Sequence, residues 1–367
     1  MPSKKSIQAL ITRINKQYGQ NVIVLASEAK GLAYKRVSTG SFGLDIGTSG
    51  GFVYGRIHKV ISKEFVGKTS LAYSVIASIH REIDDSYCAF VDAEDTYDPV
   101  MAERLGVDQT RLLLIKPDCL EQAGDVVQEC LEAKLLLNVT IDSWQSLFPT
   151  EEYEKEMGDK IVGTNAMGKN KLMRKILAGI RADLTSDNPR CMVVILNHIN
   201  FKIGVMFGSP ETDSGGMAKN YLSSISIKLA TMGSIDKTIR GIKRRVGKKI
   251  KWIVEKNKTG IPFMEGNYDV YTHPLSGKVF GIDRDQEILD YALKHKLIGK
   301  DLSLKDFVSN TINTRLKRLA VMQKIRRLEL GVENTRTGSG AGFKKEPSKK
   351  HKARKKTFKK IGRKKSS

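Results

Sequence analysis

The residue types best suited to chemistry lie in one short stretch, residues 62–70. It follows an apolar run at 56–61 and precedes apolar residues at helical spacing. At such a strand-to-helix turn, backbone N–H groups face phosphate oxygens, a lysine reaches the β/γ-phosphates and a threonine holds Mg²⁺. We therefore predict a phosphate-binding loop, although serine stands where the pattern has its first glycine. The loop comprises Ser62, Lys63, Glu64, Phe65, Val66, Gly67, Lys68, Thr69 and Ser70.

Two acidic residues stand where other apolar runs end. Asp142 closes the run 135–141, and Glu94 follows the run 88–91. Because the carboxyl ends of parallel strands meet at one edge of a sheet, we expect both acids near the phosphate loop. There Asp142 would anchor Mg²⁺ together with Thr69, and Glu94 would polarise a water that attacks the γ-phosphate. Taken alone, each acid is equally compatible with a solubilising role in a loop.

The stretch from 197 to 216 mixes apolar residues with four glycines. Such a composition suits a loop whose Ile203, Met206 and Phe207 pack against nucleotide bases. A hairpin or a subunit contact is the alternative interpretation.

The elements that must position these residues alternate along the chain. Apolar runs predict strands at 56–61, 88–91, 112–115, 135–141 and 192–196, and apolar periodicity predicts helices at 71–83, 120–133 and 169–184. This alternation predicts an α/β fold with a mostly parallel sheet covered on both faces. Residues 6–18 predict an amphipathic helix and residues 22–25 a short strand. That unit is too small to bury its apolar face alone, so we expect it to pack on the main body or on another subunit.

Composition and charge restrict the class of protein. No run approaches the roughly 20 apolar residues of a membrane helix, and the N-terminus lacks an apolar signal core, so we expect an intracellular protein. The four cysteines are too irregularly spaced for a metal knuckle. The net charge is +23, with thirteen Lys/Arg against one acid in residues 344–367 and a second concentration between Lys237 and Lys258. These charges favour a nucleic-acid partner; a solubilising or targeting tail is the alternative.

Several longer motifs, taken together, resemble the bacterial RecA recombinases over residues 6–330. The most specific is the run 202–212, which is similar to the second DNA-binding loop of that family almost unchanged. The resemblance implies a RecA-type P-loop ATPase core at 35–276, a small N-terminal helix–strand oligomerisation unit at 1–34 and a small C-terminal α/β domain at 277–330. Beyond residue 330, Gly, Ser and Thr residues followed by lysines predict a disordered basic tail at 331–367. The other matching motifs are residues 38–41, 44–46, 92–99, 105–108, 122–123, 141–143, 256–258 and 262–263.

The resemblance also implies roles for single residues. Glu94 matches the catalytic glutamate, and Asp98 falls where the family contacts adenine. Lys256 and Lys258 match lysines that reach the ATP of the neighbouring subunit. Residues two apart on a strand face the same way, which agrees with that role, although a solvated basic strand is the alternative. The implied DNA-binding residues are Gly158, Asp159, Lys160, Ile161, Val162, Gly163, Ile199, Asn200, Lys202, Ile203, Gly204, Val205, Met206, Phe207, Gly208, Gly215 and Gly216.

Some positions depart from the family pattern. His198 stands where the family has a glutamine that senses the γ-phosphate, and we place it with Glu94 and Lys68 among the catalytic residues. Met167 and Asn200 stand where arginines are usual, and the tail is basic instead of acidic. These departures indicate a divergent member, and a phage origin is one interpretation.

The resemblance implies an ATP-dependent homologous recombination protein with Mg²⁺ as its cofactor. It would form filaments on single-stranded DNA and promote pairing and strand exchange with homologous double-stranded DNA. Single-strand-binding and mediator proteins would be further partners, in the cytoplasm at the nucleoid or, for a phage protein, in the host cytoplasm. Two alternatives stay open: a ring-forming DNA helicase or motor on the same core, and a DNA-binding accessory protein that does not hydrolyse ATP.

Overall fold

The computed structural model describes residues 3–19, 21–29, 34–154, 164–181, 188, 190–201, 211–213, 218–273, 276–299, 303–311 and 315–329. The predictions for residues 158–163, for most of the stretch 202–216 and for the tail 331–367 fall outside these ranges.

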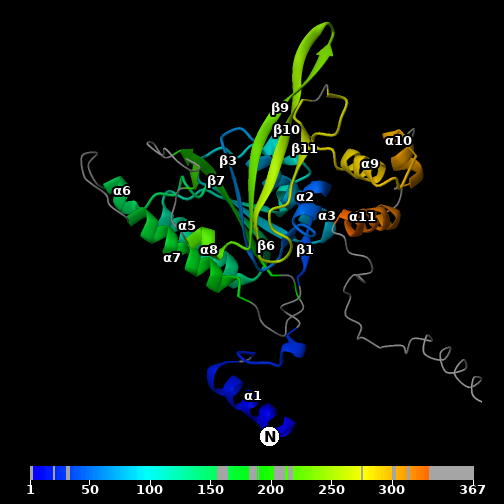
Figure 1. Cartoon of the computed structure of the whole chain (residues 1–367). Coiled ribbons are helices and arrows are strands. Elements are labelled where there is room, and N and C mark those ends of the chain that lie inside the picture. The colour runs from blue at the N-terminus through cyan, green and yellow to red at the C-terminus, as the bar shows by residue number, and fades with distance from the viewer. Residues whose placement is uncertain are drawn as a thin grey trace, which may run out of the picture.

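One twisted sheet organises the chain (Figure 1). Its order is β12-β11-β10-β9-β3-β7-β6-β4-β5. The strands from β9 to β5 run parallel to one another, and the pairs β9–β10, β10–β11 and β11–β12 are antiparallel. The predicted α/β class with a mostly parallel sheet is therefore confirmed. The strands are β3 (Ile57–Ser62), β4 (Tyr87–Asp92), β5 (Leu112–Ile115), β6 (Leu136–Asp142), β7 (Met192–Phe201), β9 (Ile225–Ile239), β10 (Ile242–Asn257), β11 (Glu265–Tyr271) and β12 (Gly281–Ile282).

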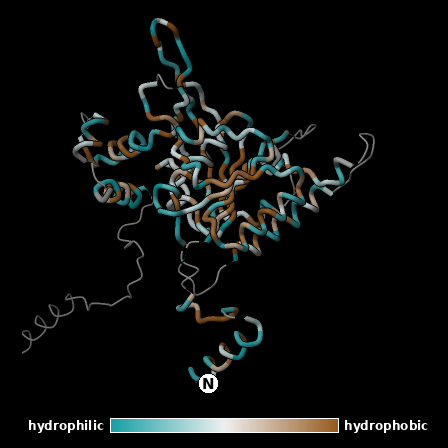
Figure 2. The backbone as a smooth tube through the Cα atoms, turned by 180° about the vertical axis from the view of Figure 1, so that it is seen from behind, coloured by the Kyte–Doolittle hydropathy of each residue, from teal (hydrophilic) through white to brown (hydrophobic). Residues whose placement is uncertain are grey.

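Both faces of the parallel half are buried, because successive side chains of a strand point to opposite faces. In β4, Cys88 and Phe90 enter one apolar core while Ala89 and Val91 enter the other. The apolar strands form the centre of Figure 2. On the first face lie α3 (Lys68–Glu82) and α4 (Pro99–Arg104); on the second lie α5 (Leu120–Ala133), α7 (Thr164–Gly179) and α8 (Ala218–Leu222).

A third, smaller core joins the C-terminal helices to the body. Phe42 and Ile46 of α2 (Phe42–Gly47) pack against Ile288, Phe307 and Ile325. The described part of residues 277–330 is mainly helical. The helices are α9 (Arg284–Lys294), α10 (Leu304–Asp306), a π-turn (Phe307–Thr311) and α11 (Arg315–Glu329). The remaining short elements are β1 (Arg36–Val37), β2 (Phe52–Val53), β8 (Glu211–Asp213), α6 (Thr150–Glu154) and the 3₁₀ turns Ala26–Glu28 and Gln109–Arg111.

The N-terminal helix α1 (Lys4–Tyr18) stands apart from the sheet (Figure 1). Ser3 caps it, and it ends at Gly19 as predicted. Ile7 and Leu10 remain 38% and 37% exposed. Its apolar face is thus available to another surface.

The strand predicted at residues 22–25 is wrong. Those residues are irregular and lead into the 3₁₀ turn Ala26–Glu28. The Asn15 side chain bonds both the N–H and the C=O of Ile23, which holds the segment against α1. A strand exists only with a partner, and no described strand of this chain lies beside these residues.

Two predicted boundaries also shift. The helix predicted at 169–184 begins earlier, at Thr164, and ends earlier, at Gly179, a residue common at helix ends. Strand β7 runs past residue 196 to Phe201, because its last three residues pair with β8 outside the main sheet. None of the described helices has the length and apolar character that crossing a membrane requires.

Candidate functional site

The phosphate loop connects β3 to α3, as predicted. Gly67 caps α3 with φ +111°, a left-handed conformation that glycine adopts readily. Phe65 also has positive φ (+56°), and its side chain is 86% exposed. The Phe65 carbonyl accepts a hydrogen bond of 2.6 Å from Lys248 Nζ of β10. The loop is therefore tied to the antiparallel half of the sheet.

Lys68, the first residue of α3, is buried beneath the loop. Its Nζ lies 3.4 Å from Ser62 Oγ and 3.3 Å from the Lys63 carbonyl. Burial lowers the pKa of Lys68, and Asp142 and Glu94 oppose that shift. Both contacts are long for a charged donor, so the ammonium group retains strong capacity to bind an anion such as phosphate.

Thr69 and Asp142 meet at the carboxyl edge of the sheet. Thr69 Oγ1 donates to Asp142 Oδ2 at 2.6 Å, across 73 residues of sequence. Burial raises the pKa of Asp142 to about 6, although the Thr69 hydrogen bond opposes the shift. A hydroxyl and a carboxylate side by side offer the oxygen ligands that Mg²⁺ prefers, so these residues fit the metal.

Glu94 is held by three donors. Its Oε1 accepts from Ser143 Oγ at 2.5 Å and from Ser146 Oγ at 2.9 Å, and it lies 3.1 Å from His198 Nε2. Burial acts to raise the pKa of Glu94, but these hydrogen bonds lower it overall. Glu94 is thus an oriented, ionised carboxylate, suited to accept a hydrogen bond from a water.

His198 connects Glu94 to Lys68. Its Nδ1 lies 3.4 Å from Lys68 Nζ while its Nε2 faces Glu94. One neutral tautomer satisfies both contacts, with Nε2–H donating to Glu94 and Nδ1 accepting from Lys68. The three predicted catalytic residues therefore form one continuous contact.

A cavity of about 510 Å³ opens beside these residues. The phosphate loop, Glu94 and the end of β7 all contribute to its wall. Ile199 and Asn200 lie on that wall and pair with Asp213 and Thr212 of β8, so residues 199–201 and 211–213 form an antiparallel pair. The lining residues are Lys63, Glu64, Glu94, Gln145, Ser146, Phe148, His198, Ile199 and Asn200.

Three predicted site residues lie away from Lys68. Asp98 is exposed and caps α4 by accepting from Met101 N at 3.0 Å. Lys256 and Lys258 converge on the C-terminal end of α8: both contact the Tyr221 carbonyl, at 3.2 and 2.6 Å. Burial, with Lys258 as the next cause, lowers the pKa of Lys256 to about 8. The remaining DNA-binding predictions, Gly158–Gly163, Lys202–Gly208, Gly215 and Gly216, fall outside the described residues.

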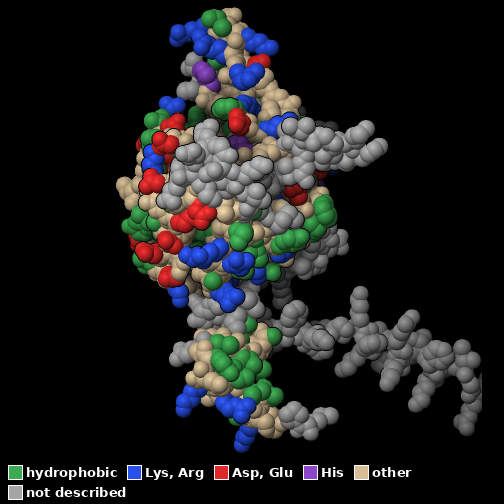
Figure 3. Space-filling model, turned by 90° about the vertical axis from the view of Figure 1, so that its left-hand side faces the viewer, with side chains coloured by type: hydrophobic (Ala, Val, Ile, Leu, Met, Phe, Trp, Pro, Cys, Tyr) green, Lys and Arg blue, Asp and Glu red, His purple; other side chains and the backbone are tan. Residues whose placement is uncertain are grey.

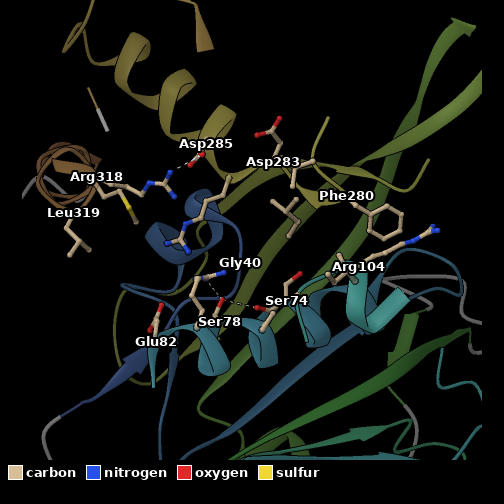
Figure 4. Close-up of a pocket in the computed structure, with 18 residues that line it drawn as sticks. Gly40, Ser74, Ser78, Glu82, Arg104, Phe280, Asp283, Asp285, Arg318 and Leu319 are labelled. Atoms are coloured by element: carbon tan, nitrogen blue, oxygen red, sulfur yellow. Dashed lines mark hydrogen bonds and ion pairs between the residues drawn. The ribbon is translucent and has the colours of Figure 1, made fainter. Parts of the chain in front are cut away.

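A second cavity, of about 690 Å³, lies between α3 and the C-terminal helices (Figure 4). Two of its arginines are held by acids: Arg318 pairs with Asp285 of the same wall at 3.0 Å, and Arg284 pairs with Asp45, outside the lining, at 3.2 Å. The predicted phosphate loop, residues 62–70, is not among the residues that line it. We interpret this cavity as the seam between α3 and the C-terminal helices.

Sequence reasoning missed three residues that shape the site. Ser143 and Ser146 orient Glu94, and Lys248 holds the phosphate loop. For Ser143 the signal is the motif at 141–143, which contains it. Ser146 and Lys248 carry no such signal, because serine is common in loops and lysine is common on exposed strands.

Comparison with known proteins agrees with this geometry. The family model described as the RecA N-terminal domain matches residues 5–275. A protein named "Protein RecA" from Delftia acidovorans is 36% identical over 298 residues, which cover 81% of this chain and 76% of that relative. The chain belongs to the RecA family.

Proposed function

We propose that this protein is an ATP-dependent recombinase, which assembles on single-stranded DNA and pairs it with a homologous duplex. The observation that carries the proposal is the position of His198. It contacts Lys68 and Glu94, and it stands four residues before the stretch 202–212. A change at the nucleotide can thereby reach a DNA loop through one side chain.

The carboxyl edge supplies the groups that ATP hydrolysis needs. Lys68 would bind the β/γ-phosphates, with the backbone of residues 62–70 around them. Thr69 and Asp142 would hold Mg²⁺, which neutralises charge on the phosphate oxygens when bound. Glu94 would orient a water for attack, and the hydroxyls of Ser143 and Ser146 keep its carboxylate in place.

The DNA-binding role rests on the segments beside this edge. Residues 158–163 and the stretch 199–216 would line the path of the single strand, with Ile199 and Asn200 fixed at the entry by β8. A single strand bound there would shift the end of β7, and His198 lies in that end next to Ile199. A shift of His198 would change its contacts with Glu94 and Lys68, so ATP hydrolysis would depend on DNA.

Two exposed apolar surfaces of the chain are suited to self-assembly: the apolar face of α1 and the edge strand β5. The edge strand β5 exposes Leu113 and Leu114 by 47% and 44%. Its outer side has no partner strand within the described ranges. We propose that α1 and residues 22–25 of a neighbouring copy dock on this edge, where the segment 22–25 gains the strand partner that its own chain does not provide.

Lys256 and Lys258 would then act between subunits. Lys256 lies at the end of β10 and Lys258 just after it, and both ammonium groups reach the Tyr221 carbonyl at the end of α8. Facing the ATP of a neighbour, they would stabilise the assembly only while the nucleotide is bound. Asp98 would contact adenine from the start of α4. We place the protein in the cytoplasm, with single-strand-binding and mediator proteins as further partners.

A homologous pairing assay tests the proposal. The protein is assembled with ATP on a long single strand and then offered a homologous or a heterologous duplex. We expect joint molecules with the homologous duplex alone, and only with ATP. Equal products from both duplexes, or ATP-driven unwinding without pairing, would favour a motor and overturn the proposal.

A further inference from the structure

Lys169 of α7 is a buried cation. On the side of the molecule where α6 and α7 lie, charged side chains of both signs are exposed to solvent (Figure 3). Lys169, by contrast, is only 2% exposed. Its Nζ donates to the Gln145 carbonyl at 3.1 Å and lies 5.6 Å from the centre of the Phe148 ring. Because the face of an aromatic ring attracts a cation, the two contacts together hold the ammonium group in one place.

The burial of Lys169 is unfavourable for folding. Lys175 of the same helix pairs with Asp125 at 3.0 Å, whereas Lys169 forms no ion pair within the described ranges. Burial lowers the pKa of Lys169 to about 8, with Lys219 as the next cause, and Glu152 opposes the shift. An apolar side chain of the same length would fill this space without the cost of a buried charge. The lysine is therefore better explained by a role in activity than by a role in stability.

The carbonyl that Lys169 binds belongs to the turn that orients Glu94. We call this turn, residues 143–146, the serine turn. Its two hydroxyls, of Ser143 and Ser146, donate to Glu94 Oε1 at 2.5 and 2.9 Å, and Ser146 N closes the turn on the Ser143 carbonyl at 3.2 Å. A shift of the Gln145 carbonyl would thus move the hydroxyls that hold the carboxylate.

Helix α7 also contacts the elements next to both predicted DNA-binding segments. Asn165 Nδ2 donates to Glu152 of α6 at 3.3 Å, and residues 158–163 lie between α6 and α7 in the sequence. Asn170 Oδ1 accepts from the first N–H of α8 at 3.2 Å, and α8 follows the stretch 199–216. Figure 1 shows α7 beside α5 and α8. A single helix therefore joins both segments to the serine turn.

We propose that Lys169 is a positioning residue for ATP hydrolysis, which holds the serine turn where its hydroxyls orient Glu94 and makes that position depend on α7. The inference rests on the proposed function, because it requires Glu94 to orient a water and DNA to bind beside α7. A strand bound there would shift α7, and Lys169 would carry the shift to the serine turn. This route is separate from that through His198, which reaches Glu94 from β7.

The test compares steady-state ATP hydrolysis by the full chain, with and without long single-stranded DNA, in the wild type and in Lys169→Met. Methionine has a similar length but neither the donor nor the charge. We expect kcat with DNA to fall by at least about 10-fold while KM for ATP changes by less than about 2-fold, because the contacts to bound ATP remain. Stimulation by DNA should shrink. The melting temperature should not fall, because a buried charge has been removed.

A double-mutant cycle with Ser146→Ala separates positioning from a general effect on structure. If Lys169 acts through the serine turn, removing the Ser146 hydroxyl also removes most of what Lys169→Met can still lose. The double variant should then hydrolyse ATP only slightly more slowly than the slower single variant. Losses that multiply in the double variant would overturn the inference, because the two residues would then act independently.

Lys171→Met changes an exposed lysine two residues along α7 and is the matched control, which should keep the wild-type turnover. An equal loss of kcat in Lys171→Met would overturn the inference. So would a clearly lower melting temperature of Lys169→Met, because the lysine would then serve the fold.

The outcomes also separate this inference from the proposed function. Wild-type kcat in Lys169→Met, together with homologous pairing by the wild type, would reject the role of Lys169 alone. A wild type whose hydrolysis depends on Lys169 but which fails the pairing assay would keep that role and reject the recombinase function. Absence of hydrolysis in the wild type would overturn both.

Discussion

The two halves of the sheet carry functional residues in opposite ways. In the parallel half, Thr69, Glu94 and Asp142 are partly or wholly buried and bonded to neighbours at distances of 2.5–2.9 Å. In the antiparallel half, the cations at the end of the β9–β10 hairpin are exposed, and among the described residues no ion pair involves Arg240, Arg244 or Arg245. Parallel strands bring several strand ends to one edge, whereas an antiparallel pair can extend beyond the sheet. The first arrangement suits chemistry at one point, and the second suits contact along a polymer.

The difference predicts unequal effects of removing one charge. Glu94→Gln should reduce steady-state ATP hydrolysis by at least about 100-fold, because the amide cannot orient the water as a carboxylate does. ATP and DNA binding should persist, as measured with a fluorescent nucleotide and a labelled single strand. Arg244→Gln, at the exposed end of the β9–β10 hairpin, should leave ATP hydrolysis unchanged. It should weaken duplex binding only by the loss of about one phosphate contact, which lowers the slope of log affinity against log salt by about 0.9.

Glu103→Gln, on an exposed surface of α4, is the matched control for the loss of a carboxylate. If Glu94→Gln hydrolysed ATP at nearly the wild-type rate, Glu94 would have no catalytic role, and the two halves of the sheet would not differ in the way described.

Assembly should depend on the contact proposed between α1 of one copy and the free β5 edge of the next. Leu10→Glu places a charge on the exposed apolar face of α1. If Leu10 is buried between two subunits, its loss should weaken each subunit–subunit contact by about 2 kcal/mol, which is about 30-fold in the affinity of one subunit for the next. Sedimentation with ATP and single-stranded DNA should show shorter assemblies, while the far-ultraviolet circular dichroism stays that of the wild type.

Gln8→Glu adds the same charge to the opposite side of α1 and should assemble normally. If Leu10→Glu assembled as well as Gln8→Glu, α1 would have no role between subunits.

The smallest effect should come from the seam between the antiparallel half and the C-terminal helices. Glu287 of α9 is buried and accepts from Ser41 Oγ and Phe42 N, both at 2.8 Å. Burial raises its pKa to about 8, although these hydrogen bonds oppose the shift. The native state then binds more protons than the unfolded state between about pH 4.5 and 8, so stability falls as the pH rises through that window. We therefore expect the melting temperature to fall as the pH rises through that window.

Glu287→Gln should flatten that decline, and Glu129→Gln, an exposed carboxylate on α5, should not. Parallel pH profiles for the wild type and Glu287→Gln would show that this carboxyl does not titrate at the seam.

The sequence predicted most of the parallel half. The strand 112–115 and the helix 120–133 have the predicted limits. In the helix, the residues that face the core recur at helical spacing as far as Leu131. The meeting of Lys68, Glu94 and Asp142 followed from the rule that parallel strands share a carboxyl edge. Local sequence carries the information in each of these cases.

The antiparallel half was harder to predict. The cations from Lys237 to Lys258 were recognised as a concentration of charge, but not as a hairpin turning at Arg240 and Gly241. Arginine at the first turn position hides the usual signal of asparagine followed by glycine. The strand predicted at 22–25 is wrong for a related reason: a short apolar run becomes a strand only where a partner strand lies beside it, and none of the described strands of this chain does.

The central claim is that the carboxyl edge hydrolyses ATP and that DNA controls it. The most direct test is steady-state phosphate release by the full chain, with and without long single-stranded DNA, beside Lys68→Ala. We predict that DNA stimulates release several-fold and that Lys68→Ala abolishes it, because no other described side chain can replace the buried ammonium at the loop. Absence of turnover in the wild type, despite measurable DNA binding, would contradict the claim and indicate a DNA-binding accessory protein.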